Sequence, residues 1–187
     1  MLKEAYMKTT YINHCGFTVL LQEMTLLFDY YNGNIPELPK EKPLYVFVSH
    51  SHKDHFNSEI FSLSHKYSNI TFILSNDITM EGLEELIPDL VLLLKDKIHF
   101  IGPNENLSLL QENFSITIET LKSTDAGVAF LITTPKETIY HSGDLNLWSW
   151  SDEPEEENLE MEKAFKEEIN KIRGRHINLA FMTLDPR

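Results

Sequence analysis

The pattern of apolar and polar positions divides the chain into many short strand-like segments and a few helical ones. The continuous apolar run Leu-Tyr-Val-Phe-Val at 44–48 is typical of a strand buried on both faces. Short runs rich in Val, Ile, Thr and Phe favour further strands. These are predicted at 9–12, 16–21, 25–30, 70–74, 91–94, 98–101, 107–110, 114–119, 128–133, 137–140 and 176–184.

Helices are predicted at 57–66, 78–87 and 152–172. The second should end before Pro88, because proline disfavours the helical conformation of the residue that precedes it. The third has apolar side chains at helical spacing from Met161 to Ile172, which predicts an amphipathic helix with its acidic residues on a solvated face. Without repeats or a linker, the chain is expected to form a single α/β domain over 1–187, with layered sheets and helices.

Composition and charge exclude several classes of protein. With 42% hydrophobic residues the chain is not disordered, and 16 Lys+Arg against 29 Asp+Glu give a net charge of −13, which disfavours a large nucleic-acid interface. The longest apolar runs, such as 90–94, are far shorter than the ~18 residues of a membrane span. Residues 1–5 lack the apolar segment of a secretory signal, and the single cysteine, Cys15, fits a reducing compartment, so we expect a cytoplasmic protein.

The most informative segment is His50-Ser51-His52-Lys53-Asp54-His55, directly after the buried strand 44–48. From the chain's own composition, this H-x-H-x-D-H pattern would arise by chance in about one such sequence in a thousand. His50 and His52 should point to the same side of an extended segment and can bind one metal ion. Asp54 and His55 then follow on a turn, aimed at a second position. Imidazoles with a carboxylate are the ligand set of Zn²⁺ and related first-row metals.

A second candidate lies at Ser142-Gly143-Asp144, after the predicted strand 137–140. Glycine lets the backbone pass close to a ligand, but the same tripeptide is also an ordinary turn. In a chain that also has H-x-H-x-D-H, Asp144 offers a carboxylate able to bridge two ions.

The strand 44–48 leading into the histidine motif, together with Gly143-Asp144 after a later strand, resembles the metallo-β-lactamase-fold hydrolase superfamily. Within that superfamily, Asn-His-Cys-Gly-Phe at 13–17 and Thr-Leu-Leu-Phe-Asp at 25–29 are similar to the L-ascorbate-6-phosphate lactonase branch. The stretch 145–150 resembles uncharacterised relatives of that branch. The resemblance implies an αββα sandwich with a two-metal site at one edge of its sheets.

The resemblance also implies a role for each candidate ligand. His50 and His52 would bind the first ion, Asp54 and His55 the second, and Asp144 would bridge the two. A metal-bound hydroxide, oriented by Asp54 as the catalytic residue, would attack an ester, lactone or phosphoester of a small-molecule substrate. The expected cofactor is Zn²⁺, as one or two ions, with Mn²⁺ and Fe²⁺ as alternatives.

Two positions depart from the family pattern. Ser123 stands where a third histidine for the first ion is expected, and a serine hydroxyl is a poor zinc ligand. His141 and Asp125 are the alternative residues that could complete that ion's ligands. No histidine follows the last predicted strand, so either the second site is incomplete or the sandwich is C-terminally incomplete.

Two functional hypotheses therefore stand, a metal-dependent hydrolase and a metal-poor relative that acts as a binding or assembly domain. The metal content of the purified protein distinguishes them. The apolar segment 176–184 is expected to be an interior or near-interior strand, covered by a second copy of the chain or left as an exposed apolar patch. His14 beside Cys15 suggests a metal or thiol site, but a single Cys–His dipeptide is a weak signal, and the two are interpreted as a buried loop pair near the mouth of the site. Trp148 and Trp150 are interpreted as a pocket wall or as packing anchors.

Overall fold

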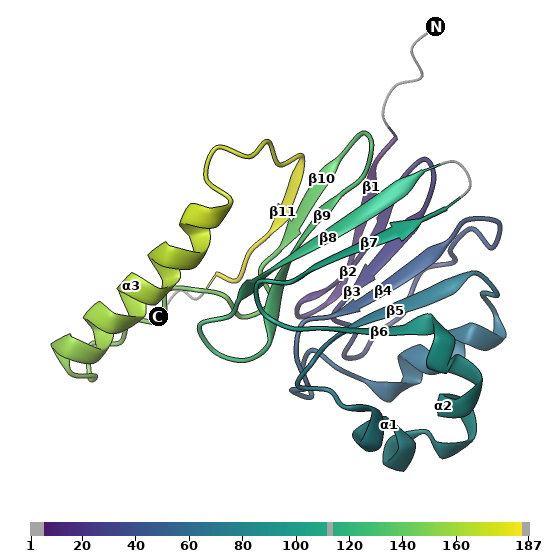
Figure 1. The fold of residues 1–187 in the computed structure, drawn as a ribbon, viewed down its shortest axis with the longest axis horizontal. Coiled ribbons are helices and arrows are strands. Elements are labelled where there is room, and N and C mark those ends of the chain that lie inside the picture. Colours follow the sequence, from purple (N-terminus) through teal and green to yellow (C-terminus); the bar gives the residue numbers. More distant parts are fainter. Residues whose placement is uncertain (1–5, 112–113, 185–187) are drawn as a thin grey trace, which may run out of the picture. The chain divides into compact units, whose positions relative to one another are not determined.

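The structure is a computed structural model, which describes residues 6–111 and 114–184. The chain forms two compact units, divided between Ile101 and Gly102, and each is built on one mixed β-sheet (Figure 1). The α/β class is therefore confirmed, while a single domain over 1–187 stays a prediction. The expectations about a leader and about the C-terminal end rest on residues 1–5 and 185–187, which lie outside the described residues.

The N-terminal unit contains a six-stranded sheet in the order β1-β2-β3-β4-β5-β6. Its strands are β1 (Lys8–Asn13), β2 (Gly16–Leu20), β3 (Thr25–Phe28), β4 (Leu44–Val48), β5 (Ile70–Ser75) and β6 (Ile98–Ile101). The first three strands pair antiparallel, and β3 to β6 pair parallel. All five residues of β4 are buried, as its apolar run predicted. Because parallel strands end at the same edge, residues that follow β3, β4 and β5 emerge close together.

The helices of this unit are η1 (Ser58–His65), α1 (Met80–Leu86), α2 (Pro88–Leu94) and η2 (Lys95–Lys97). Apolar side chains of η1, α1 and α2 join those of the strands in one core cluster, which includes Val46, Phe72, Phe61, Leu83 and Val91. These helices therefore cover the face of the sheet to which Val46 points.

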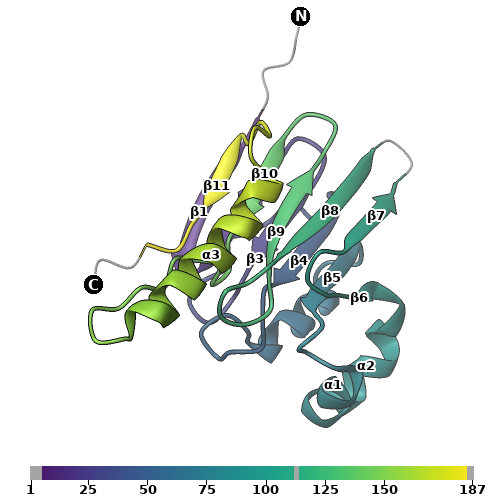
Figure 2. The same ribbon diagram turned by 60° about the vertical axis from the view of Figure 1, so that its left-hand side comes forward.

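The C-terminal unit contains a five-stranded sheet in the order β11-β10-β9-β8-β7 and one long helix. Its elements are β7 (Asn106–Leu110), β8 (Ser115–Lys122), β9 (Val128–Thr133), β10 (Thr138–His141), α3 (Glu155–Lys171) and β11 (Leu179–Phe181). Neighbouring strands pair antiparallel except β10 and β11, which pair parallel. Phe165 and Ile169 of α3 pack against a cluster of sheet residues that includes Leu131 and Tyr140, so the predicted amphipathic helix is confirmed (Figure 2).

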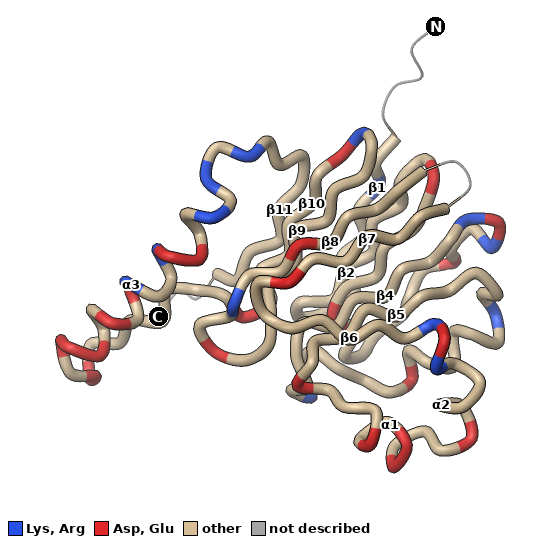
Figure 3. The backbone as a smooth tube through the Cα atoms, in the orientation of Figure 1, with Lys and Arg blue, Asp and Glu red and all other residues tan. Residues whose placement is uncertain are grey.

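Acidic residues occur along most of the length of α3, as the sequence suggested (Figure 3). Glu168 departs from this pattern, because it is only 9% exposed and accepts a hydrogen bond from the backbone N–H of Lys122. Among the helices of the described segments, none combines the length and the apolar character that a membrane span requires.

Three predicted elements are wrong or differ in detail. Residues 91–94, predicted as a strand, form the end of α2, because Pro88 ends one helix and serves as the first residue of the next. Residues 58–65 form a 3₁₀-helix rather than an α-helix. The strand within 176–184 is only three residues long and lies at the edge of its sheet, and its central Ala180 is exposed, so it is not an interior strand.

Candidate metal centre

The candidate centre of the N-terminal unit begins where the parallel strands β3 and β4 end. Asp29 follows β3, and its backbone N–H donates to Phe47 O of the neighbouring strand at 3.0 Å. Its φ of 39° lies in the left-handed region, which costs a non-glycine residue conformational free energy. Residues in such conformations cluster at functional sites. The backbone N–H and the hydroxyl of Ser49, just after β4, both donate to the Asp29 carboxylate, at 2.8 and 2.6 Å.

Asp29 also determines which ring nitrogen of His55 carries the proton. Nδ1 of His55 lies 2.8 Å from Oδ2 of Asp29, and both side chains are buried. An ionised carboxylate only accepts hydrogen bonds, so Nδ1 is the donor and carries the proton. Nε2 of His55 then has the lone pair that a metal ion requires, the arrangement common to metal-binding histidines.

The same argument reaches His50 through Ser49. The single hydroxyl proton of Ser49 is donated to Asp29, so its oxygen can only accept from Nδ1 of His50, which lies 3.0 Å away. His50 therefore also carries its proton on Nδ1 and its lone pair on Nε2. One buried carboxylate thus prepares two buried imidazoles to bind metal through the same nitrogen.

His52 lies in a bend after β4 that is fixed at two points. The Ser51 N–H donates to Asp77 Oδ2 at 2.8 Å, and the His55 N–H donates to His52 O at 3.0 Å. The ring of His52 is exposed and lies edge-on to that of His50, with 4.6 Å between the ring centroids. The centroid of His55 is 4.1 Å from that of His50, so the three imidazoles form one cluster.

Asp54, the predicted catalytic residue, lies on the turn beside this cluster. Its side chain is 54% exposed, and its Oδ2 lies 3.2 Å from Nε2 of His14. Desolvation raises the pKa of the Asp54 carboxyl, but a backbone hydrogen bond and the nearby rings of His55, His14 and His50 outweigh it, so the pKa lies below its usual 3.8. The carboxylate is therefore ionised at neutral pH and can bind a metal ion or accept a hydrogen bond.

The residues of this unit fit a first-row divalent metal ion. Two buried imidazoles have their lone pairs on Nε2, a third ring lies next to them, and an ionised carboxylate is adjacent. Nitrogen and carboxylate donors are the set that zinc and its neighbours prefer. In the N-terminal unit, His50, His52, Asp54 and His55 therefore lie close together, and their roles as ligands of two ions stay a prediction.

The remaining predicted site residues belong to the C-terminal unit. Asp144 follows β10 after Gly143, whose φ of 50° is the left-handed conformation that glycine allows. The indole N–H of Trp148 donates to Asp144 O at 3.0 Å and holds the turn. Trp148 and Trp150 stack with 6.0 Å between centroids. The role of Asp144 as a bridging ligand stays a prediction.

His141 differs from His50 and His55 in its proton position. Its Nδ1 accepts the backbone N–H of Gly143 at 3.1 Å, so a neutral His141 carries its proton on Nε2. In that tautomer neither nitrogen presents a lone pair to a metal ion. The predicted role of His141 as a ligand therefore requires this hydrogen bond to be lost.

Ser123, at the position where the family pattern suggests a histidine, has a local structural role. It is buried, and its hydroxyl accepts the N–H of Asp125 at 3.1 Å, which closes the turn that follows β8. Asp125 itself is exposed.

Sequence reasoning missed three residues of the N-terminal centre, Asp29, Ser49 and His14. Asp29 and His14 are two of the three non-glycine residues with positive φ among the described residues, a signal that only a structure provides. The interpretation of His14 and Cys15 as a buried pair is wrong, because the His14 side chain is 47% exposed and Cys15 is only half-buried.

Comparisons with known proteins agree with this architecture. The UPF0173 metal-dependent hydrolases of Desulforamulus reducens and Pyrobaculum neutrophilum are 28% identical over 156 residues and 26% identical over 148 residues. Each match covers 76% of this chain, and 64% and 63% of the respective relative, so the chain spans less than two thirds of their length.

The fold is similar to that of CmlA, a diiron beta-hydroxylase from Streptomyces venezuelae, with a TM-score of 0.59 at 14% identity. This match covers 97% of this chain and 35% of that chain, and it supports the predicted metallo-β-lactamase type of fold, with its two mixed sheets. A family model described as the beta-lactamase superfamily domain matches residues 16–164. Since that match covers well over half of the sequence, the chain belongs to the beta-lactamase superfamily domain family.

Proposed function

We propose that this chain is a metal-dependent hydrolase that uses water to cleave an ester, lactone or phosphoester bond in a small molecule. Membership of the beta-lactamase superfamily supports the proposal, as do the curated relatives, which are described as metal-dependent hydrolases. The similarity of 13–17 and 25–29 to the lactonase branch favours a lactone or sugar-phosphate substrate.

The observation that carries the proposal is the shared proton arrangement of His50 and His55. Asp29, directly and through Ser49, keeps the Nδ1 proton on each ring and leaves Nε2 to bind a metal ion. Burying an aspartate with two histidines costs free energy, which the hydrogen bonds among them offset. The tautomer that these hydrogen bonds hold is the one that metal-binding histidines adopt.

Held by these residues, a divalent ion would supply a nucleophile from water at neutral pH and polarise the bond to be cleaved. The chain's own residues hold and orient it. His50, His52 and His55 supply neutral nitrogen donors, which favours Zn²⁺ over harder ions such as Mg²⁺. Asp54, which is exposed and ionised, would accept a proton from the attacking water or orient it.

The test is the metal content of the purified protein together with its hydrolytic activity. We expect zinc in wild type by elemental mass spectrometry, and at least a tenfold loss of zinc affinity in His50→Gln and His55→Gln. His65→Gln replaces an exposed histidine outside the motif and should keep the wild-type zinc content.

The zinc-loaded protein should hydrolyse at least one of a nitrophenyl ester, a sugar lactone and a nitrophenyl phosphodiester, and His50→Gln should not. Wild type that binds no zinc would instead support the metal-poor binding or assembly domain. Wild type that binds zinc but hydrolyses none of the three would overturn the proposed hydrolase.

A further inference from the structure

The turn between β1 and β2 places a histidine and the chain's cysteine beside His55. The two strands pair as far as Asn13 and Gly16, so His14 and Cys15 form the whole connection. His14 has φ of 50°, a conformation that such two-residue turns usually assign to Gly or Asn. A Cβ atom at Gly16 would lie 2.9 Å from Asn13 O, so this closely packed turn presents both side chains from a fixed backbone.

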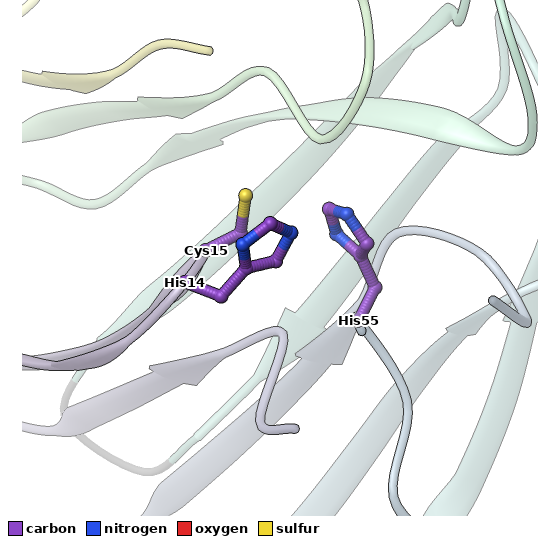
Figure 4. Close-up of side chains that lie close together, drawn as sticks. All are labelled: His14, Cys15 and His55. Carbon is purple, nitrogen blue, oxygen red and sulfur yellow. The ribbon is translucent and has the colours of Figure 1, made fainter. Parts of the chain in front are cut away.

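Three possible ligand atoms gather at this turn. One from each of His14, Cys15 and His55 lie within 4.8 Å of one another. Figure 4 shows the imidazole of His14 extending toward that of His55, with Cys15 next to it, and the two ring centroids are 5.3 Å apart. Two ligands of a tetrahedral zinc ion lie about 3.3–3.8 Å apart, given bonds of ~2.0–2.3 Å. Side-chain rotations of the exposed His14 and the half-buried Cys15 that move their ligand atoms by about an ångström would therefore bring the three atoms to the separations of zinc ligands.

The carboxylate partners of the two rings decide which nitrogen of each is left to bind metal. Nε2 of His14 faces the Asp54 carboxylate at 3.2 Å and so carries its proton there, which leaves the lone pair on Nδ1. His55 carries its proton on Nδ1 toward Asp29 and has its lone pair on Nε2. Each histidine can thus bind metal while it keeps its carboxylate contact, the arrangement that orients metal-binding imidazoles.

We propose that His14, Cys15 and His55 form a sulfur-containing metal site, which takes Zn²⁺ or Co²⁺ through two imidazole nitrogens and one thiolate. On binding, the Cys15 thiol loses its proton to solvent and its sulfur forms the metal bond. Thiolate and imidazole ligands select such ions over Mn²⁺ and Mg²⁺, which prefer oxygen. The inference rests on the proposed function, since His55 also belongs to the histidine motif. It adds His14 and Cys15, from the turn between β1 and β2, as ligands of the ion that His55 would bind.

Cobalt provides a direct test, because a thiolate bound to Co²⁺ gives an intense near-ultraviolet charge-transfer absorption that nitrogen and oxygen ligands do not give. Metal-free protein would be titrated with Co²⁺ and its absorption recorded. Because the chain has one cysteine, any such band reports Cys15. We expect the band in wild type and its loss in Cys15→Ser. In His14→Gln, the Co²⁺ affinity measured from the growth of the band should be reduced about 10–100-fold. His65→Gln is the matched control and should keep the wild-type band.

The outcomes separate this inference from the proposed function. Co²⁺ binding by wild type without the band, or a band that His14→Gln leaves unchanged, would overturn the sulfur-containing site and leave a hydrolase with nitrogen and oxygen ligands. Failure of wild type to bind either Co²⁺ or Zn²⁺ would overturn both. Far-ultraviolet circular dichroism of the metal-free variants shows that each is folded, and the near-isosteric serine keeps the turn.

Discussion

Oδ2 of Asp29 accepts a hydrogen bond from Nδ1 of His55 at 2.8 Å, and each of the two side chains is only 1% exposed. The carboxylate also accepts two hydrogen bonds from Ser49. A single buried residue thereby fixes the ring orientation and the proton position of the histidines on which the proposed chemistry depends.

Asp29→Asn should weaken zinc binding about 10–100-fold while the chain stays folded. Asparagine tolerates the positive φ at this position, but its amide cannot accept from both Ser49 and His55, and its NH₂ group would face a donor. Competition with a chromophoric chelator measures the change. Asp96→Asn, at an exposed position in η2, is the matched control, and equal zinc affinity in the two variants would show that Asp29 does not set the tautomer.

His141→Gln should leave zinc affinity within about twofold of wild type. This contrasts with the loss expected on replacing a residue that binds the ion directly, such as His50. The reason is that Nδ1 of His141 accepts from the Gly143 N–H, which keeps the proton on Nε2. Chelator competition on wild type and variant in parallel decides the point. A loss comparable to that of His50→Gln would show that His141 gives up this hydrogen bond and binds the ion.

Glu168→Gln should lower the free energy of unfolding by about 1–3 kcal/mol. The buried carboxylate accepts from the Lys122 backbone N–H at 3.0 Å and from Lys171 Nζ at 2.6 Å, and an amide cannot replace both contacts. Urea denaturation followed by circular dichroism gives the difference. Glu167→Gln, one residue earlier on an exposed position of α3, should change stability by less than about 0.5 kcal/mol. A similar effect of the two substitutions would mean that the buried contacts do not stabilise the helix.

The stability of the fold should decrease in mild acid through His99 of β6. Desolvation lowers the pKa of this half-buried imidazole below its usual 6.5. Below pH 6.5 the unfolded chain then binds a proton that the folded chain does not, so stability is lost as the pH falls from 6.5 toward the folded pKa.

In His99→Gln this contribution is absent, so its urea midpoint should fall less than that of wild type between about pH 7.5 and about pH 5.5. Above pH 7.5 the difference between the two midpoints should be constant. Parallel curves over the whole range would rule out His99 as a source of acid sensitivity.

Long or strongly patterned segments could be predicted from the sequence, and short ones could not. The β-branched and aromatic residues in the apolar run of β4 favour a strand, and the helical spacing of apolar residues in α3 favours a helix. The four residues Val91–Leu94 favour neither, since a short apolar run fits a buried strand or a helix equally well. Their structure depends on Pro88, which can end a helix or begin one.

The candidate site was partly predictable for a similar reason. His50, His52, Asp54 and His55 are close in sequence, so their spacing alone suggested ligands for two neighbouring metal positions. Asp29 lies 20 residues before Ser49, and only the parallel pairing of β3 with β4 brings the two together. Proton positions on the rings depend on hydrogen-bond partners in space, which is why His141 and His50 could not be distinguished from the sequence.

Because β3 to β6 are parallel, their carboxyl ends all lie at one edge of the sheet and their amino ends at the opposite edge. Asp29, Ser49 and Asp77 all follow the carboxyl ends of β3, β4 and β5, whereas the connections that lead into β4 and β5 lie at the opposite edge. Changes of loop length at that opposite edge would leave the imidazole cluster undisturbed. The exposed residues Lys40 and Glu41, just before β4, are therefore a natural place to insert a reporter sequence and follow metal uptake without altering the centre that binds it.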